Sequence, residues 1–214
     1  MSSSPWHDRF LGLSRLPPRL SDGELAEFFT LSPGDVAAIR GQFRPKYRIA
    51  AGIQLGFVRM TGGRLGALKT LPRNLLGFIG KQVGEPAPSI ASLRSLYRRQ
   101  NTRYEHQAWA MHRLHIRTVG PRQERHLFAD LKEASSTTAS RERLMGFARQ
   151  WLYERKFLVP RDSTLRDLVD RAARETEKAI YEVMCEAVSA AKRAEWFKVL
   201  VSDHGDGRTV IEWL

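Results

Sequence analysis

Apolar residues at helical spacing are the feature that most constrains what this chain can fold into. Four apolar residues of PKYRIAAGIQLGFVRM share one face of an amphipathic helix: Ile49, Ile53, Phe57 and Met60. A similar stripe runs through residues 161–200, as one long helix or two. We therefore predict an all-α fold, with the option of a short β-hairpin in the alternating segment 203–214.

Short polar motifs mark where several helices begin. SDGE (21–24) is a capping box, in which the serine accepts a hydrogen bond from a backbone N–H and the glutamate reaches back. SPGD (32–35) starts another helix, with its proline at the first helical position. TRYE has the pattern of a further capping box and predicts a helix start at Thr102.

The charge of the chain is high and unevenly distributed. The net charge is +12, and residues 40–126 carry 17 Lys or Arg but three acids, whereas the remainder is slightly acidic. Such a block favours a polyanionic partner, most often nucleic acid, over a membrane surface. No stretch approaches the roughly 18 apolar residues of a membrane span, and the N-terminus lacks a secretory pattern. The single cysteine, Cys185, excludes an intramolecular disulfide and indicates a reducing, cytosolic setting.

The segment SLYRRQNTRYEH (95–106) is the first candidate site. Arg94 and Arg98 are i, i+4 neighbours, as are Arg99 and Arg103, and like charges at that spacing repel by roughly 0.2–0.5 kcal/mol. Contact with phosphate would compensate this repulsion, and a helix start at Thr102 would add backbone N–H donors. Two helices meeting at this polar joint fit a helix-turn-helix. The alternative is a solvated basic helix face.

The second candidate is PRDSTLRDLV (160–169), where a helix start follows a proline. Four residues there could contact phosphates or bases: Arg161, Ser163, Thr164 and Arg166. The preceding helix (140–156) could serve as its partner in a second helix-turn-helix. Plain helix capping is the alternative. Arg48, on the amphipathic helix described first, is also assigned to DNA binding.

Catalytic and metal-binding patterns are weak. His112 and His115 are i, i+3, but no third ligand of suitable type lies near them, so we predict no metal and no cofactor. Arg98, Arg103, His106 and Tyr104 could be imagined as a tyrosine-nucleophile strand-exchange site, although nothing in their spacing is specific for one. We therefore assign no catalytic residue.

The polar run SSTTAS (135–140) is the predicted linker, and it coincides with the change from basic to balanced charge. We expect a basic helical DNA-binding module over 1–134 and a second helical module over 135–214. The second module contains the long helix and ends at VIEWL in mid-pattern, as expected if the chain is a truncated part of a longer protein.

Several stretches resemble, in order, the N-terminal region of the replicative class II transposases of the Tn-three family: LSDGELAEFFTLSPGDVAAIR, YRIAAGIQLGFVRMTGGRL, LPRNLLGFIGKQVG and YRRQNTRYEHQAWAMHRLHIRTV. PRDSTLRDLVDRA and GDGRTVIEWL look like the continuation, so the resemblance covers residues 10–214. In that family the N-terminal region recognises the terminal inverted repeats of the transposon. The acidic residues that hold two metal ions for strand cleavage and joining lie far downstream. The resemblance therefore implies a DNA-binding role, without catalysis, for the matching residues Arg94, Arg98, Arg99, Arg103 and His106, and for Arg161, Ser163, Thr164 and Arg166.

We thus expect sequence-specific binding to double-stranded DNA at transposon ends, in the cytoplasm of a bacterium at its nucleoid, with a homodimer formed by the full-length protein. A stand-alone DNA-binding regulator of transcription or transposition would have the same chemistry. A helical protein–protein scaffold is the remaining alternative, and it would show no salt-dependent DNA binding.

Overall fold

The computed structural model describes residues 8–66, 68, 71–202 and 209. These residues form helices joined by loops, with no β-strand among them, and a parallel bridge joins Arg117 and Phe157. The all-α prediction is confirmed, whereas the C-terminal hairpin falls almost wholly outside the described residues. The elements are η1 (Asp8–Phe10), α1 (Asp22–Phe29), α2 (Pro33–Gln42), α3 (Pro45–Thr61), α4 (Arg73–Val83), α5 (Ile90–Leu96), α6 (Gln100–Arg113), α7 (Pro121–Thr137), α8 (Arg141–Glu154), α9 (Asp162–Ala187) and α10 (Ala190–Leu200).

The first two capping motifs determine helix starts as predicted. Ser21 and Glu24 form a reciprocal capping box at α1, and Ser32 and Asp35 form one at α2. The predicted start at Thr102 is wrong, because α6 begins two residues earlier with Arg99 at its N-cap position. No side-chain hydrogen bond caps α6 at Arg99, and the buried residues of this helix begin only at His106.

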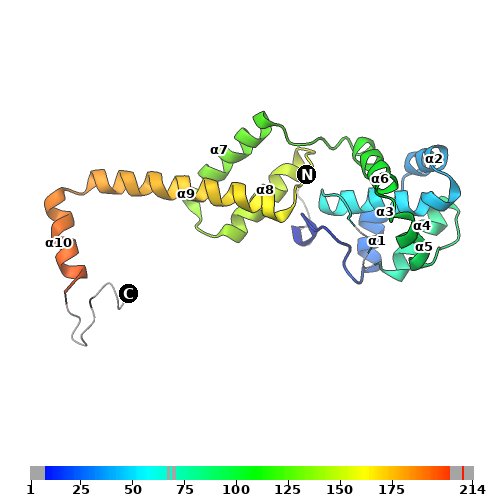
Figure 1. The fold of residues 1–214 in the computed structure, drawn as a ribbon, viewed down its shortest axis with the longest axis horizontal. Helices are drawn as coiled ribbons and strands as arrows, with labels where there is room; N and C mark the ends of the chain where they lie inside the picture. Colours follow the sequence, from blue (N-terminus) through cyan, green and yellow to red (C-terminus); the bar gives the residue numbers. More distant parts are fainter. Residues whose placement is uncertain (1–7, 67, 69–70, 203–208, 210–214) are drawn as a thin grey trace.

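The N-terminal cluster, formed by buried residues between Phe10 and Ala110, surrounds α3. All four residues of the predicted apolar face of α3 are 3% exposed or less. Leu55 and Val58, on other faces of the helix, are also fully buried, because α1, α2, α4 and α6 all pack against α3. Figure 1 shows these helices gathered around α3, which therefore forms the centre of this cluster.

The C-terminal cluster, formed by buried residues between Leu127 and Ala173, joins α7, α8 and the first half of α9. These three helices pack against one another as a group beside the N-terminal cluster (Figure 1). Trp151 on α8 is buried and donates a hydrogen bond of 2.6 Å to Asp130 on α7. The module boundary at residue 134 stays a prediction. Along the sequence, the change from one hydrophobic cluster to the other falls earlier, between Ile116 and Val119, because α7 packs on α8 and α9.

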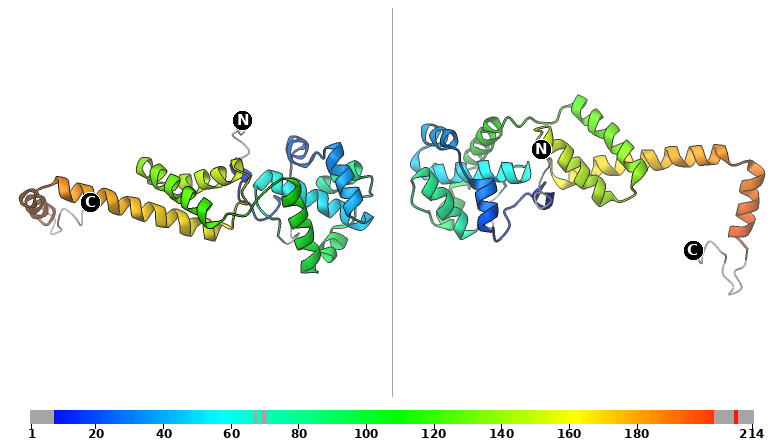
Figure 2. Two further views of the ribbon diagram at one scale, coloured as in Figure 1. Left: turned by 90° about the horizontal axis from the view of Figure 1, so that it is seen from above. Right: turned by 180° about the vertical axis from the view of Figure 1, so that it is seen from behind.

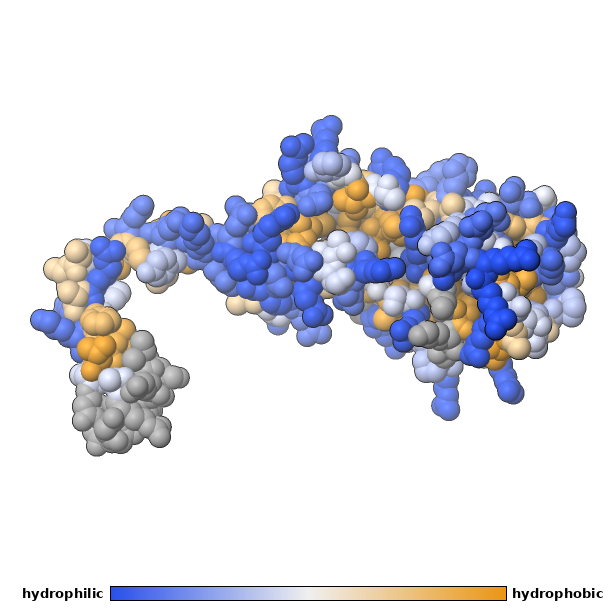
Figure 3. Space-filling model, viewed as in Figure 1, coloured by the Kyte–Doolittle hydropathy of each residue, from blue (hydrophilic) through white to orange (hydrophobic). Residues whose placement is uncertain are grey.

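The second half of α9 extends away from the clusters and carries α10 at its end (Figures 1 and 2). The predicted inner face of α9 is buried only as far as Thr176. Beyond it the apolar stripe is exposed, and Figure 3 shows apolar side chains along this arm. The exposed apolar residues of the arm are Ile180, Tyr181, Val183, Met184, Trp196, Phe197, Val199 and Val201.

Candidate nucleic-acid interface

The end of α3 meets the loop between α8 and α9, and this contact joins the two clusters. The backbone N–H of Val159 donates to the carbonyl oxygen of Gly62 at 3.0 Å. The hydroxyl of Tyr153 donates to the carbonyl oxygen of Arg59 at 2.7 Å. Both bonds cross between the clusters, so these hydrogen bonds position one cluster on the other.

Gly62 ends α3 in the left-handed conformation, with φ of 67°. A Cβ atom at this position would lie 2.7 Å from Cγ2 of Val159, which is closer than real Cβ contacts allow. At the next residue, Gly63, a Cβ would lie 3.7 Å from the carbonyl oxygens of both Leu13 and Val159. Gly62 therefore allows the end of α3 to approach Val159 closely, whereas a Cβ at Gly63 would make only ordinary contacts.

A cleft of about 740 Å³ opens where these segments meet α6. Its walls come from the loop after η1, the loop after α3, the loop before α9 and one side of α6. Four arginines line it, together with the exposed ring of Tyr104: Arg15, Arg64, Arg103 and Arg161. Arg103 belongs to the first predicted site and Arg161 to the second, so the fold brings the two sites to one cleft.

The cleft is strongly cationic. Its carboxylate, Asp162, already accepts a 3.0 Å hydrogen bond from Arg149. Among the described residues no ion pair joins any of the four lining arginines to a carboxylate. Arg64 instead contacts the sulfur of Met111 at 3.2 Å, and the Arg103 guanidinium lies 5.4 Å from the centre of the Tyr104 ring. Like charges gathered without counter-charge attract an anion.

The α5–α6 joint presents further arginines beside this cleft. Arg98 and Arg99 are exposed, and no ion pair holds either of them to a described carboxylate. Arg94 is also exposed, but its Nε donates to the carbonyl oxygen of Leu68 at 2.9 Å. Arg98 and Arg99 can therefore reach a ligand without breaking an ion pair, whereas Arg94 supports the loop before α4. A helix-turn-helix at this joint stays a prediction.

His106, predicted as a DNA contact, lies in the core instead. It is 1% exposed, and its Nδ1 shares a hydrogen bond of 3.0 Å with the hydroxyl of Tyr97. The rings of Phe43 and Tyr47 pack edge-on against it. Burial lowers the pKa of His106 to about 4, so its imidazole is neutral at pH 7. The prediction of a surface contact disagrees with this position, because a histidine seven residues after Arg99 falls on the inner face of α6.

Arg48 is also engaged within the protein. It forms an ion pair of 2.7 Å with Glu85 and donates from Nε to the carbonyl oxygen of Phe43 at 3.1 Å. Its side chain is 22% exposed. Arg48 therefore joins the end of α2 to the turn after α4 and has little capacity left for a ligand.

The start of α9 is exposed as the sequence predicts. Ser163, Thr164 and Arg166 are all accessible to solvent, and Arg161 occupies the N-cap position. No side-chain hydrogen bond caps the helix there, so the alternative of plain side-chain capping is not what the geometry shows. The first backbone N–H groups of α9 lie beside the cleft and add partial positive charge to it.

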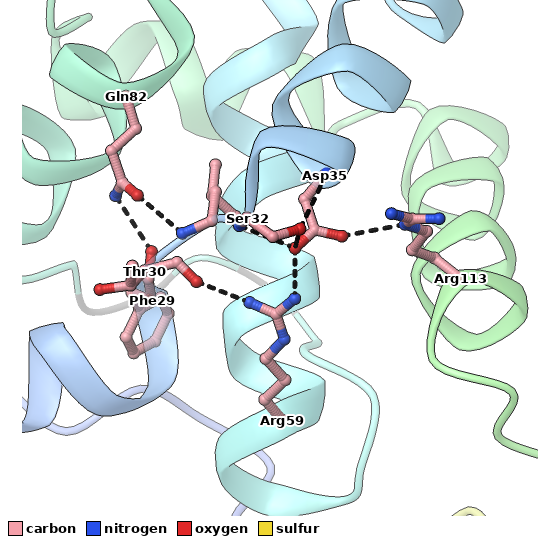
Figure 4. A network of polar contacts seen from close by, with 8 residues as sticks. Phe29, Thr30, Ser32, Asp35, Arg59, Gln82 and Arg113 are labelled. Atoms are coloured by element: carbon pink, nitrogen blue, oxygen red, sulfur yellow. Dashed lines mark hydrogen bonds and ion pairs between the residues drawn. The ribbon is translucent and has the colours of Figure 1, made fainter.

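Other basic residues form a structural network, drawn in Figure 4. Asp35 accepts hydrogen bonds from Arg59 at 2.6 Å and from Arg113 at 2.9 Å, while it also caps α2 through Ser32. Burial alone would raise the pKa of Asp35, but the hydrogen bonds from Arg59, Ser32 and Arg113 outweigh it and lower the pKa to about 2. This carboxylate ties α2, α3 and α6 together, and its arginines are not available to DNA.

Sequence reasoning missed Arg15 and Arg64, because each lies in a loop without helical periodicity. A signal existed for Arg64, which directly follows the glycine pair that ends α3. Arg15 lies in a Pro- and Arg-rich stretch that gave no local pattern. Only the tertiary fold brings the two arginines to Arg103 and Arg161.

The described part of the chain holds no membrane-spanning helix and no metal cluster. None of its helices is both long and apolar enough to cross a bilayer. No group of three or more His, Cys, Asp or Glu side chains in that part is placed to hold a metal ion.

Comparison with known proteins gives consistent matches. The family model described as "Domain of unknown function (DUF4158)" matches residues 8–172. The transposase for insertion sequence element IS1071 in transposon Tn5271, from Comamonas testosteroni, is 31% identical over 98% of this chain and 21% of its own length. The transposases for transposon Tn1546 from Enterococcus faecium and transposon Tn501 from Pseudomonas aeruginosa are 22% and 25% identical, over 89% and 91% of the chain. This chain covers 19% of each of the latter two, so it spans about a fifth of the length of these relatives.

Proposed function

The chain belongs to the DUF4158 family, and we propose that it is the part of a DNA transposase that binds the terminal inverted repeats of the transposon. The resemblance to the N-terminal region of Tn-three transposases is confirmed by the matches to three transposases. To this similarity the proposal adds sequence-specific binding of DNA. It would serve transposition, a form of DNA recombination.

The observation that carries the proposal is a set of exposed arginines without carboxylate partners. Arg98 and Arg99 at the α5–α6 joint, and Arg161 and Arg166 at the start of α9, have no ion pair with a described residue. Some arginines elsewhere in the fold are paired, as Arg59 and Arg113 are with Asp35. An unpaired guanidinium can fork onto phosphate oxygens or onto the edge of guanine.

The proposed contacts divide into two kinds. Arg98 and Arg99 would neutralise phosphates, which provides affinity that depends on salt but not on sequence. Ser163, Thr164 and Arg166 lie on the first turns of α9, where side chains could reach base edges in the major groove and provide specificity. Because the side chains at the start of α9 are exposed, they are free to contact base edges while the arginines of the α5–α6 joint contact phosphates.

The proposed role of this chain is binding rather than chemistry. Because the chain matches about a fifth of each transposase, strand cleavage and joining are assigned to the remaining part of the parent protein. The parent would act on genomic DNA, which places it in the bacterial cytoplasm at the nucleoid. The homodimer expected for the full-length protein belongs to this proposal as well.

Fluorescence anisotropy with two duplexes tests the proposal. One duplex carries the terminal inverted repeat that flanks the gene, and the other has the same composition in scrambled order. We expect the end duplex to bind at least about 10³-fold more tightly than the scrambled duplex, the lower range for specific DNA-binding proteins. Equal affinities would contradict sequence-specific recognition, and no binding to either duplex would overturn the whole proposal.

A further inference from the structure

The cleft between the clusters has a feature that a general basic surface does not: four arginines from four separate segments line one concave space. We propose that this cleft seats a phosphate group of the DNA backbone, held by Arg15, Arg64, Arg103 and Arg161. The inference rests on the proposed function and assigns it a defined binding site, including two residues that belong to neither predicted site.

The charge of the cleft favours an anion. The four guanidinium groups have no carboxylate partner among the described residues, and Asp162 is bound by Arg149 at 3.0 Å. Arg64 contributes a sulfur contact and Arg103 an aromatic contact, neither of which neutralises charge. A phosphate would accept charge-assisted hydrogen bonds from several of these groups at once.

The walls of the cleft are held in place before any ligand arrives. Gln107, which is buried, donates from its side-chain amide to the carbonyl oxygen of Leu65 at 2.6 Å and so fixes the loop that carries Arg64. The backbone N–H of Gly12 donates to the carbonyl oxygen of Thr61 at 3.0 Å and fixes the loop that carries Arg15. A preorganised site loses less conformational entropy on binding.

Tyr104 favours a DNA backbone over a free phosphate ion as the source of the phosphate. Its ring is 52% exposed and lies at the cleft beside Arg103. An apolar ring next to a phosphate site can pack against deoxyribose or a base, whereas a free ion offers nothing for it to contact. A DNA phosphate seated here would also make both clusters contact the same duplex.

Two variants and a set of modified duplexes test the inference. The double variant, which combines Arg15→Gln and Arg64→Gln, removes two cleft charges without touching the proposed contacts at the α5–α6 joint or on α9. Arg141→Ala is the control variant. Arg141 is already paired with Asp170 and Glu177, outside the cleft. Circular dichroism melting checks that each variant folds.

We expect the double variant to bind the end duplex about tenfold more weakly at fixed salt, and its salt slope to fall by up to about 0.9, the value for one lost phosphate contact. Single neutral methylphosphonate linkages, placed one by one along the duplex, should weaken the wild type at one short stretch. At that stretch the double variant should be less sensitive, because two of the four arginines that hold the phosphate are gone.

The remaining outcomes overturn the inference in distinguishable ways. If the wild type binds the end duplex and the folded double variant binds it equally, the cleft is not a backbone site, although the proposed function stands. If inorganic phosphate saturates the cleft in an NMR titration and the variants lose this binding while DNA affinity is unchanged, the occupant is a free phosphate. If the wild type binds no DNA, the proposed function fails first.

Discussion

The hydroxyl of Tyr153 on α8 donates a 2.7 Å hydrogen bond to the carbonyl oxygen of Arg59 on α3. This bond lies at the junction of the two clusters, next to the backbone bond from Val159 to Gly62. The junction matters for function because the cationic cleft opens beside it, between walls that belong to both clusters.

Replacing Tyr153 with Phe removes this hydrogen bond and leaves the ring in place. We expect the free energy of unfolding to fall by about 1 kcal/mol, the usual net contribution of one hydrogen bond. Urea denaturation followed by circular dichroism measures the change. An unchanged midpoint would show that the bond does not stabilise the junction.

Gly62→Ala should be more damaging than an ordinary glycine substitution. The left-handed φ of 67° and the 2.7 Å approach to Val159 both oppose a Cβ atom, so we expect a loss of about 1–3 kcal/mol. Gly146→Ala in α8 is the matched control, because open space surrounds that position. The control should be neutral or stabilising by up to about 1 kcal/mol. Equal melting temperatures for the two variants would contradict this account of the junction.

Asp35 should make stability depend on pH in the acid range. Its folded pKa of about 2 lies below its ordinary value of 3.8, so its contribution is complete above pH 3.8 and is lost as the pH falls toward 2. The contribution at neutral pH is about 1–2 kcal/mol. Asp35→Asn should be less stable than the wild type at pH 6, and this difference should shrink toward pH 2. A difference that stays constant with pH would contradict the role of the carboxylate.

His106 should make the folding stability depend on pH in a higher range than Asp35 does. Because its folded pKa is about 4 and the ordinary value is 6.5, the unfolded chain binds a proton between these values and the folded chain does not. Stability should therefore decline as the pH falls from 6.5 to 4, by roughly 2–3 kcal/mol from this group. NMR titration of the imidazole measures the folded pKa directly, and His106→Gln should lack this part of the decline. An imidazole that titrates near 6.5 would place His106 at the surface, as the sequence first indicated.

Local sequence patterns predicted the parts of the fold that depend on neighbouring residues. The spacing of Ile49, Ile53 and Phe57 identified α3, and Ser21 and Ser32 identified two helix starts. The same logic failed at Thr102, because α6 begins two residues earlier than its polar motif indicates, at a start that no side chain caps. It could not predict that the apolar stripe of α9 leaves the core after Thr176, since that depends on where α7 ends.

The candidate site was only partly predictable for the same reason. Charge spacing identified Arg98, Arg99 and Arg103, but it could not separate an exposed arginine from Arg48, which Glu85 holds 2.7 Å away. Glu85 is far from Arg48 in sequence, so their pairing is a tertiary effect. The cleft itself depends on loops brought together by the fold, and loops carry no periodic signal.

The most direct test of the central claim is the salt dependence of binding to the transposon end, measured for Arg98→Ala, Arg99→Ala and Arg141→Ala. Arg98 and Arg99 are exposed without ion pairs, whereas Arg141 is paired with Asp170 and Glu177. We predict that each of the first two variants weakens binding and lowers the slope of log affinity against log salt by about 0.9, while Arg141→Ala matches the wild type. Equal slopes and affinities for all three variants would contradict the claim that these unpaired arginines bind DNA.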